Sequence, residues 1–262
     1  MIKVSQLWSY PLKSGKGLSL QQASFDAEGM LNDRRVLAVD ENGLFLTARR
    51  YPQLLQLACA PEESGWLLSH PEAGDCVVNA GEATLSGKVW KDDIQALDGG
   101  DAAANWLSGV LGIKSRVALW QTASRRSGKY DLETSFADAA PILLTSEASI
   151  ERACELGGVK PDVRRFRPNI VISGVDAFAE DEWRGVSING VEFEFLDGCT
   201  RCILTTRDPD SGESHPDKQP MMALRQHHAN KDGEPLLGMN TALRSAPETS
   251  AISVGDTVEL LT

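Results

Sequence analysis

Residues 191–206 read VEFEFLDGCTRCILTT, and they begin and end with short apolar runs. These runs, Val191–Leu196 and Cys202–Thr206, have the length and composition typical of β-strands. Similar runs bounded by turn residues recur along the chain. They are Ser5–Tyr10, Arg34–Val39, Leu44–Thr47, Leu54–Cys59, Trp66–Ser69, Cys76–Asn79, Ala83–Leu85, Ile142–Leu144, Asn169–Ser173, Val186–Ile188 and Thr257–Leu261. Many short strands at this spacing predict a barrel or a sandwich.

A few helices are expected among the strands. Gly99–Leu111 has the apolar spacing of an amphipathic helix. Thr145 and Ser146 precede a second helical run that ends near Gly157, and a hydroxyl at such a position can accept a hydrogen bond from a free amide of the first turn. Met221–His228 predicts a short third helix. The expected fold is therefore mainly β with a few helices.

The polar segment Gln121–Lys129, with the sequence QTASRRSGK, is the best candidate for a linker. A linker at this place divides the chain into two β-rich domains. We therefore expect one domain over residues 1–125 and another over residues 126–262.

Composition narrows the class of protein. The chain has 262 residues, 42% of them hydrophobic, and a formal net charge of −11. A nucleic-acid-binding protein would need a dominant basic surface, so this charge argues against one. No apolar run approaches the roughly 20 residues of a membrane helix, and Met1–Ser5 does not resemble the start of a signal peptide. Five widely spread cysteines do not form a secreted disulfide framework, so we expect a cytoplasmic protein that does not associate with membranes.

The segment Cys199–Cys202 (CTRC) is the clearest candidate site. A thiolate is a ligand for soft metals, and Arg201 beside Cys202 would lower the pKa of that thiol and keep its sulfur ionised. Two other interpretations stay open, because free cysteines are often simply buried and a CxxC can be a redox pair. The redox motif usually opens a helix, however, whereas the residues after Cys202 are expected to be extended.

Basic residues near strand ends supply candidate anion contacts. Lys13 and Ser14 lie in the glycine-containing turn PLKSGKG. Arg34, Arg49 and Arg167 belong to three separate arginine clusters, DRR, TARR and RRFRPN. Such arginines can converge on one anion with paired hydrogen bonds, although each can equally be the half-solvated partner of a nearby carboxylate. No histidine stands out as catalytic.

Taken together and in this order, the motifs resemble those of the MOSC family. The motifs are Tyr10–Ser14, Asp33–Arg35, Thr47–Arg49, Thr145–Ser149, Phe166–Val171 and Cys199–Thr206. The resemblance spans almost the whole chain. It is closest to the branch with an N-terminal β-barrel domain, which includes the mitochondrial amidoxime-reducing component and bacterial relatives.

This resemblance implies an N-terminal β-barrel-like domain, a MOSC β-barrel domain, and a molybdenum cofactor held between them. The cofactor is a pterin dithiolene with a phosphate tail. The second cysteine of the C-x-R-C motif is the family's protein ligand to molybdenum, which is Cys202 here. The other cofactor contacts that it implies are Lys13, Ser14, Arg34, Thr145, Ser146, Arg167, Asn169, Thr200 and Arg201. Cys199 is left with a structural role.

The implied activity is the reduction of N-hydroxylated compounds, such as hydroxylamines and N-hydroxylated bases, a form of detoxification. The chain lacks the cysteines for an iron–sulfur cluster, so electrons are expected from a separate flavin or iron–sulfur reductase. One alternative is a non-catalytic carrier of the cofactor or of sulfur, with a persulfide on Cys202. Another is a thiol–disulfide protein that uses Cys199 and Cys202. Asp138 and Asp208 are candidate proton donors, but no spacing singles out either one.

Overall fold

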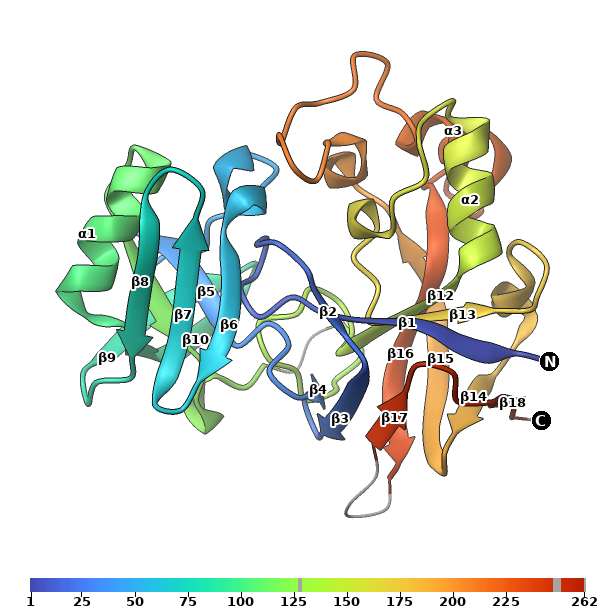
Figure 1. Ribbon diagram of the computed structural model, residues 1–262, viewed down its shortest axis with the longest axis horizontal. Helices are drawn as coiled ribbons and strands as arrows, with labels where there is room; N and C mark the ends of the chain where they lie inside the picture. The colour runs from blue at the N-terminus through green and yellow to red at the C-terminus, as the bar shows by residue number, and fades with distance from the viewer. Residues whose placement is uncertain (127–128, 247–250, 262) are drawn as a thin grey trace.

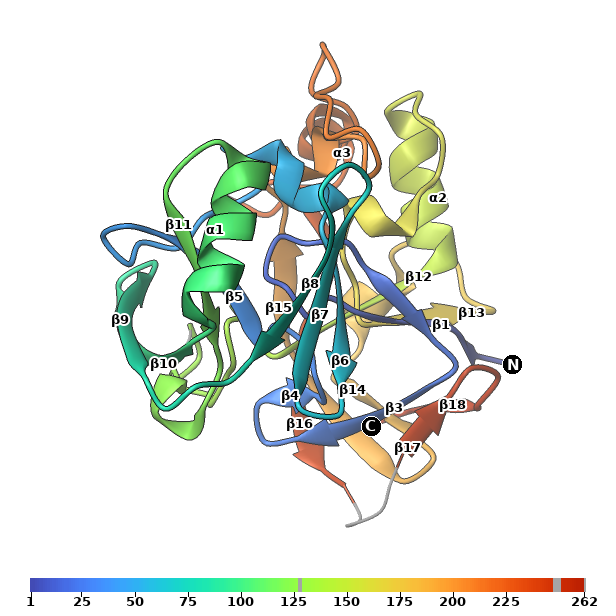
Figure 2. The same cartoon turned by 60° about the vertical axis from the view of Figure 1, so that its left-hand side comes forward.

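The computed structural model describes residues 1–126, 129–246 and 251–261. Two groups of strands lie side by side, with most of the first half of the chain in one group and the second half in the other (Figures 1 and 2). Strands dominate both groups, which confirms the prediction of a mainly β fold. None of the helices in the described ranges is long and apolar enough to cross a membrane.

The larger group is built on an eight-stranded sheet with the order β18-β14-β15-β16-β12-β13-β1-β2. Its strands are β1 (Lys3–Ser9), β2 (Leu18–Leu20), β12 (Ile142–Ser146), β13 (Ile170–Ser173), β14 (Gly185–Ile188), β15 (Val191–Thr200), β16 (Leu236–Ser245) and β18 (Val258–Leu260). Lys3 forms an isolated bridge to Thr257, next to β18. The sheet therefore curls toward a barrel, but no continuous ladder of the described strands closes it.

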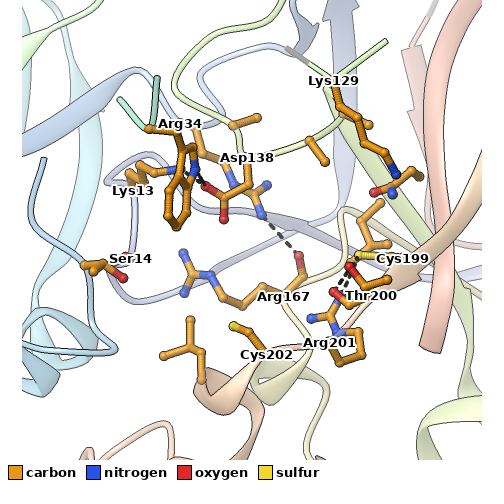
Figure 3. A pocket seen from close by; sticks show the side chains of 18 of the residues that line it. Lys13, Ser14, Arg34, Lys129, Asp138, Arg167, Cys199, Thr200, Arg201 and Cys202 are labelled. Carbon is orange, nitrogen blue, oxygen red and sulfur yellow. Dashed lines mark hydrogen bonds and ion pairs between the residues drawn. The ribbon is translucent and has the colours of Figure 1, made fainter. Parts of the chain in front are cut away.

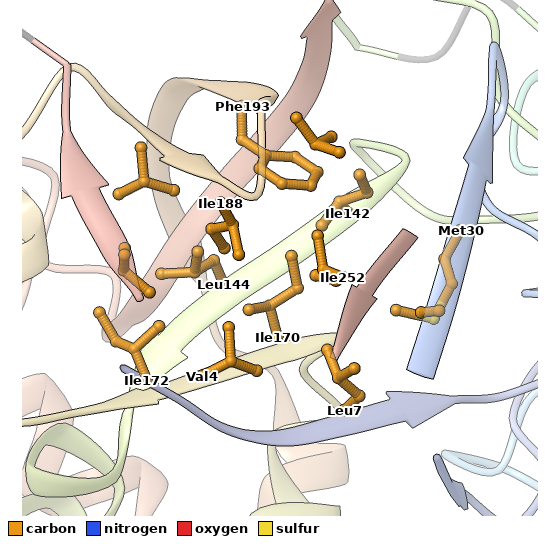
Figure 4. Close-up of a cluster of buried hydrophobic side chains, with 14 of the residues drawn as sticks. Val4, Leu7, Met30, Ile142, Leu144, Ile170, Ile172, Ile188, Phe193 and Ile252 are labelled. Atoms are coloured by element: carbon orange, nitrogen blue, oxygen red, sulfur yellow. The ribbon is translucent and has the colours of Figure 1, made fainter. Parts of the chain in front are cut away.

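Alternation along β15 shows why this sheet has a buried face. Val191, Phe193 and Phe195 are buried, whereas Glu194 between them is exposed, as expected for successive residues of a strand that point to opposite faces. Phe193 packs in one hydrophobic cluster with Ile142 and other side chains of neighbouring strands (Figure 4).

The smaller group holds a four-stranded sheet with the order β5-β11-β10-β9 and a three-stranded sheet with the order β6-β7-β8. The strands are β5 (Val36–Asp40), β6 (Ala58–Glu62), β7 (Gly65–His70), β8 (Gly74–Asn79), β9 (Thr84–Val89), β10 (Asp92–Asp98) and β11 (Ser115–Leu119). Helix α1 (Gly100–Leu111) buries Ala103, Leu107 and Leu111 against the same cluster as Leu54 and Val117.

The start of the chain packs with the second half rather than the first. Strand β1 pairs with β13, and β3 (Gln22–Asp26) pairs with β17 (Ala251–Ser253) and with β4 (Gly29–Met30). Val4 and Met30 accordingly belong to the same hydrophobic cluster as Phe193 (Figure 4). A division of the chain at residue 125 stays a prediction, and residues 127 and 128 of the expected linker lie outside the described residues.

Two further helices cover the large sheet, α2 (Glu147–Leu156) and α3 (Met221–His227). The Ser146 hydroxyl caps α2 by accepting a hydrogen bond from the amide of Ser149 at 3.0 Å, as the sequence predicts. Helix α2 begins directly after β12 of the large sheet. Strand β15 ends at Thr200, within the Cys199–Cys202 segment.

Three expected strands are wrong or incomplete. Ile203–Thr206 forms a 3₁₀ turn, because the Thr205 and Thr206 hydroxyls donate to backbone carbonyls three residues earlier. Leu44–Thr47 makes only isolated bridges. The run that starts at Leu54 splits, because Pro52 opens a second 3₁₀ turn before β6 begins.

Candidate functional site

A cavity of about 860 Å³ lies where the two groups of strands meet. The first half of the chain contributes Lys13, Arg34 and Trp90 to its lining, and the second half contributes Arg167 and Cys202. Figure 3 shows the cationic side chains and both cysteines of the CTRC segment around this space. Of the ten residues that the sequence assigned to the site, eight line the cavity: Lys13, Ser14, Arg34, Arg167, Asn169, Thr200, Arg201 and Cys202.

Lys13 and Ser14 form a tight turn after β1. The amide of Lys13 donates to the Val36 carbonyl at 2.8 Å, and Ser14 has a left-handed backbone with φ of +67°. The Lys13 ammonium donates to the Phe136 carbonyl at 2.7 Å and forms an ion pair with Asp138. Burial lowers the pKa of Lys13 to about 8, although Asp138 opposes that shift. Lys13 is therefore mostly protonated at neutral pH, but its pKa lies only slightly above that pH.

Asp138 is held ionised by the same contacts. The side chain is 60% exposed, but the surrounding cavity walls partly desolvate this carboxyl, which raises its pKa. The charge and hydrogen bond of Lys13 outweigh that effect, together with a hydrogen bond from Trp90. The net result is a pKa well below the usual range of an aspartate. Asp138 is thus a carboxylate at neutral pH, which does not favour it as a proton donor.

Arg34 and Arg167 enclose the Tyr10 ring. The Arg34 guanidinium lies 4.6 Å from the ring centroid and the Arg167 guanidinium lies 4.1 Å from it. Arg34 forms an ion pair with Asp33 and donates to the carbonyl of Arg167 at 3.2 Å. Both arginines line the cavity and have positive φ, +49° and +56°, an unusual backbone conformation that concentrates at functional sites.

Arg167 carries charge that the described protein atoms do not compensate. Its guanidinium donates to the Gly15 carbonyl at 2.6 Å but forms no ion pair with a carboxylate of the described residues. Burial and the charge of Arg34 lower the pKa of Arg167 to about 10, so it remains protonated at neutral pH. A half-buried cation without a carboxylate partner is costly, and an anionic ligand would offset that cost.

Asn169 braces this corner of the cavity. Its amide nitrogen donates to the Trp8 carbonyl at 3.2 Å, and its oxygen accepts hydrogen bonds from the Leu143 amide at 3.1 Å and from Arg34 at 3.2 Å. From its position just before β13, the side chain therefore joins β1 and β12 of the large sheet to one cationic residue.

The CTRC segment places its two thiols differently. Cys202 and Cys199 both line the cavity, and their side chains lie apart in Figure 3. The Arg201 guanidinium donates to the Cys199 sulfur at 2.9 Å and to the Phe166 carbonyl at 2.6 Å. Arg201 thus contacts Cys199, two residues away on an extended backbone, and the expected effect of Arg201 on Cys202 stays a prediction.

Thr145 and Ser146 lie outside the cavity lining, although the family resemblance assigns them to the cofactor. Both are fully buried. The Thr145 hydroxyl and the Ser146 amide each donate to one carboxylate oxygen of Glu180 at 3.0 Å. A buried carboxylate from the 3₁₀ turn Ala179–Glu182 thus occupies the donors that the motif suggested for a cofactor anion.

The sequence did not single out several residues of the lining. Trp90 lies at the tip of the β9–β10 hairpin, and Arg126 ties the linker region to that hairpin through an ion pair with Asp92 at 2.8 Å. Lys129 forms an ion pair with Asp197 at 2.6 Å. Trp90 is the only one of these residues that the sequence could have indicated, because a large aromatic side chain is unusual in a tight turn.

The donor set fits a molybdenum cofactor. An anionic phosphate would match the positive charge of Arg167 and Arg34, and the cavity is large enough for a flat organic group beside it. Cys202 opens into the same space with a thiol that can ligate a soft metal. The protein as a whole is acidic, so this concentration of cations is local.

Comparisons with known proteins agree with this arrangement. Residues 1–114 match the model of the MOSC N-terminal beta barrel domain, and residues 131–259 match that of the MOSC domain. The chain is 36% identical to mitochondrial amidoxime-reducing component 1 of Mus musculus and 32% identical to that of Homo sapiens, in both cases over 98% of this chain and 82% of the relative. It is 30% identical to mitochondrial amidoxime reducing component 2 of Bos taurus, over 97% of this chain and 82% of the relative. The chain therefore belongs to the MOSC family, in the branch with an N-terminal β-barrel domain.

Proposed function

We propose that this protein is a molybdenum-cofactor-dependent reductase of N-hydroxylated compounds. The observation that carries the proposal is that the Cys202 thiol shares one cavity with Arg167, a cation that lacks a carboxylate partner among the described residues. A metal-binding sulfur and an anion-binding site are thus combined between the two halves of the chain. The names of the relatives, which describe amidoxime reduction, support the choice of substrate class.

In this proposal Cys202 is the protein ligand to molybdenum. Arg167 and Arg34 hold the anionic tail of the cofactor, and Lys13 and Ser14 line the same space. When bound, the cofactor supplies two-electron chemistry at its metal. The overall reaction cleaves the N–O bond: R–NH–OH takes up two electrons and two protons and gives R–NH₂ and H₂O.

The electrons come from a separate donor protein, a flavin or iron–sulfur reductase, and we place the reaction in the cytoplasm. The donor must deliver two electrons for each N–O bond cleaved, singly or together. Neither nucleic acid nor a membrane has a part in the proposed reaction.

The test begins with freshly purified protein. Molybdenum is measured by mass spectrometry of the metal, and the pterin is measured by its fluorescence after oxidation. The loaded protein is then given an N-hydroxylated purine and a reduced viologen as artificial electron donor. We expect the aminopurine to accumulate; molybdenum-loaded protein that turns over no N-oxygenated substrate would remove the proposed function.

The same purified protein also tests the alternative function, a non-catalytic carrier of the cofactor or of sulfur. Cys202 is half-buried and lines the cavity, so it is accessible enough to hold a transferable sulfur. That function predicts the addition of one sulfur atom to Cys202 in the intact-protein mass, together with no turnover.

A further inference from the structure

The tip of the β9–β10 hairpin carries a tryptophan where a small residue is usual. Val89 pairs with Asp92, so Trp90 and Lys91 form a two-residue turn. Trp90 occupies its first position with φ of +56°, a conformation for which such turns select glycine or asparagine. A bulky residue held in this region is an outlier, and outliers of this kind concentrate at functional sites.

The indole is nevertheless fixed in place. Its Nε1 donates to Asp138 Oδ1 at 2.9 Å. The Phe45 ring meets it edge-on with centroids 4.8 Å apart, and the Arg49 guanidinium lies 4.6 Å from its centroid. These contacts orient the ring within the cavity lining, where Phe45, Arg49 and Asp138 also lie.

Stability of the core does not explain this ring. Trp90 is 44% exposed and belongs to none of the four buried hydrophobic clusters of the described chain. Its exposure also places it at the open edge of the cavity, since the buried Lys13 and Phe166 mark the interior. A rigid, half-exposed aromatic surface at the edge of a cavity is suited to stack on another flat ring.

The ionised carboxylate of Asp138 beside Trp90 favours a neutral ring over an anionic group as the partner of the indole. The carboxylate of Asp138 lies between the indole Nε1 and Lys13, so the ring does not directly adjoin that ammonium. Arg49 beside the ring forms neither an ion pair nor a side-chain hydrogen bond among the described residues. The open edge thus combines an aromatic plane with a carboxylate and with a guanidinium that is not hydrogen-bonded among the described residues, which suits a neutral polar heteroaromatic ring.

We infer that Trp90 determines substrate preference by stacking on the flat ring of an N-hydroxylated heteroaromatic base. The inference rests on the proposed function and refines its substrate class. Small hydroxylamines have no ring to stack, so they gain nothing from Trp90. The protein therefore prefers ring-bearing substrates, and this preference is a property of KM rather than of the chemical step.

The first experiment measures kcat and KM of the molybdenum-loaded protein with an N-hydroxylated purine and with hydroxylamine. Trp90→Leu should raise KM for the purine at least about fivefold, the lower end of the range for stacking on one base. KM for hydroxylamine and both kcat values should stay within about twofold. Trp90→Phe keeps a ring and should recover most of the affinity. Trp106→Leu removes a tryptophan of α1 whose Nε1 donates to the Ala73 carbonyl, outside the cavity, and should leave both KM values unchanged.

The second experiment separates this inference from the proposed function. Adenine cannot be reduced, so its binding to the loaded protein, measured by calorimetry, needs no turnover. Weaker adenine binding by Trp90→Leu supports the stacking role even if no substrate is reduced. Equal adenine affinity in the wild type and Trp90→Leu overturns it, whatever the turnover. Loss of molybdenum and pterin from Trp90→Leu also overturns it, because the ring would then hold the cofactor.

Discussion

The two sides of the cavity treat their positive charges differently. On the side formed by the first half of the chain, Lys13 and Arg34 each form an ion pair with a carboxylate. On the side formed by the second half, Arg167 and Arg201 donate to backbone carbonyls, and Arg201 also donates to a thiol. Among these four cations, only the two on the side that carries Cys202 lack a carboxylate partner, so an anionic cofactor would gain more from them than from Lys13 or Arg34.

The largest effect is expected from replacing Cys202, and the matched replacement of Cys199 should have a much smaller one. Cys202→Ser removes the proposed metal ligand and should lower both molybdenum content and turnover by more than about a hundredfold, since even outer partners of a ligand cost up to that much. Cys199→Ser leaves the proposed ligand in place and removes only the contact with Arg201, so its effect should be far milder. Metal analysis and the viologen-coupled assay measure both. Equal losses would indicate a CxxC redox pair instead.

The second prediction tests the uncompensated charge. Arg167→Gln should weaken retention of the cofactor about ten- to a hundredfold, the range for a lost hydrogen bond to a charged group. The control is Arg164→Gln, because Arg164 lies close in sequence but pairs with Asp162 and Asp210 outside the cavity. Retention is followed as pterin released during dialysis. Similar release from both variants would mean that Arg167 has no special part in binding.

The third prediction uses the lowered pKa of Lys13. Its pKa of about 8 means that the cation is present below that pH and is lost as the pH rises through it. Retention of the cofactor should therefore fall severalfold between pH 7 and pH 9, while Lys13→Arg, which stays protonated, should show a flatter profile. The same dialysis measures it at each pH. Parallel profiles for the two proteins would show that the Lys13 charge does not act on the anion.

The smallest effect is expected away from the cavity. Thr145→Val removes the hydroxyl that donates to the buried Glu180, which should cost about 1 kcal/mol of stability and lower the Tm by a few degrees. Cofactor content should not change, since Thr145 does not line the cavity. Thermal unfolding and pterin analysis are the two measurements. Loss of cofactor at an unchanged Tm would restore Thr145 as a cofactor contact.

The order of apolar and polar residues predicted strands and helices well where buried residues recur at the regular spacing of that element. The alternation of Val191, Phe193 and Phe195 and the apolar stripe of Gly100–Leu111 are examples. The same spacing failed where side chains form hydrogen bonds with the backbone of nearby residues. The hydroxyls of Thr205 and Thr206 turn an apolar run into a 3₁₀ turn, although β-branched residues usually favour strands.

Residue types and their order were enough to predict the family, the mainly β class and eight residues that line the cavity, because motifs such as CTRC and RPN are read along the chain. Three features depended on contacts between distant segments. Glu180 occupies the donors of Thr145 and Ser146, and Trp90 reaches Asp138 across 48 positions. The direction of Arg201 toward Cys199 depends on the path of the backbone after β15. Side-chain direction and long-range pairing arise only when the strands have packed, so a linear sequence does not display them.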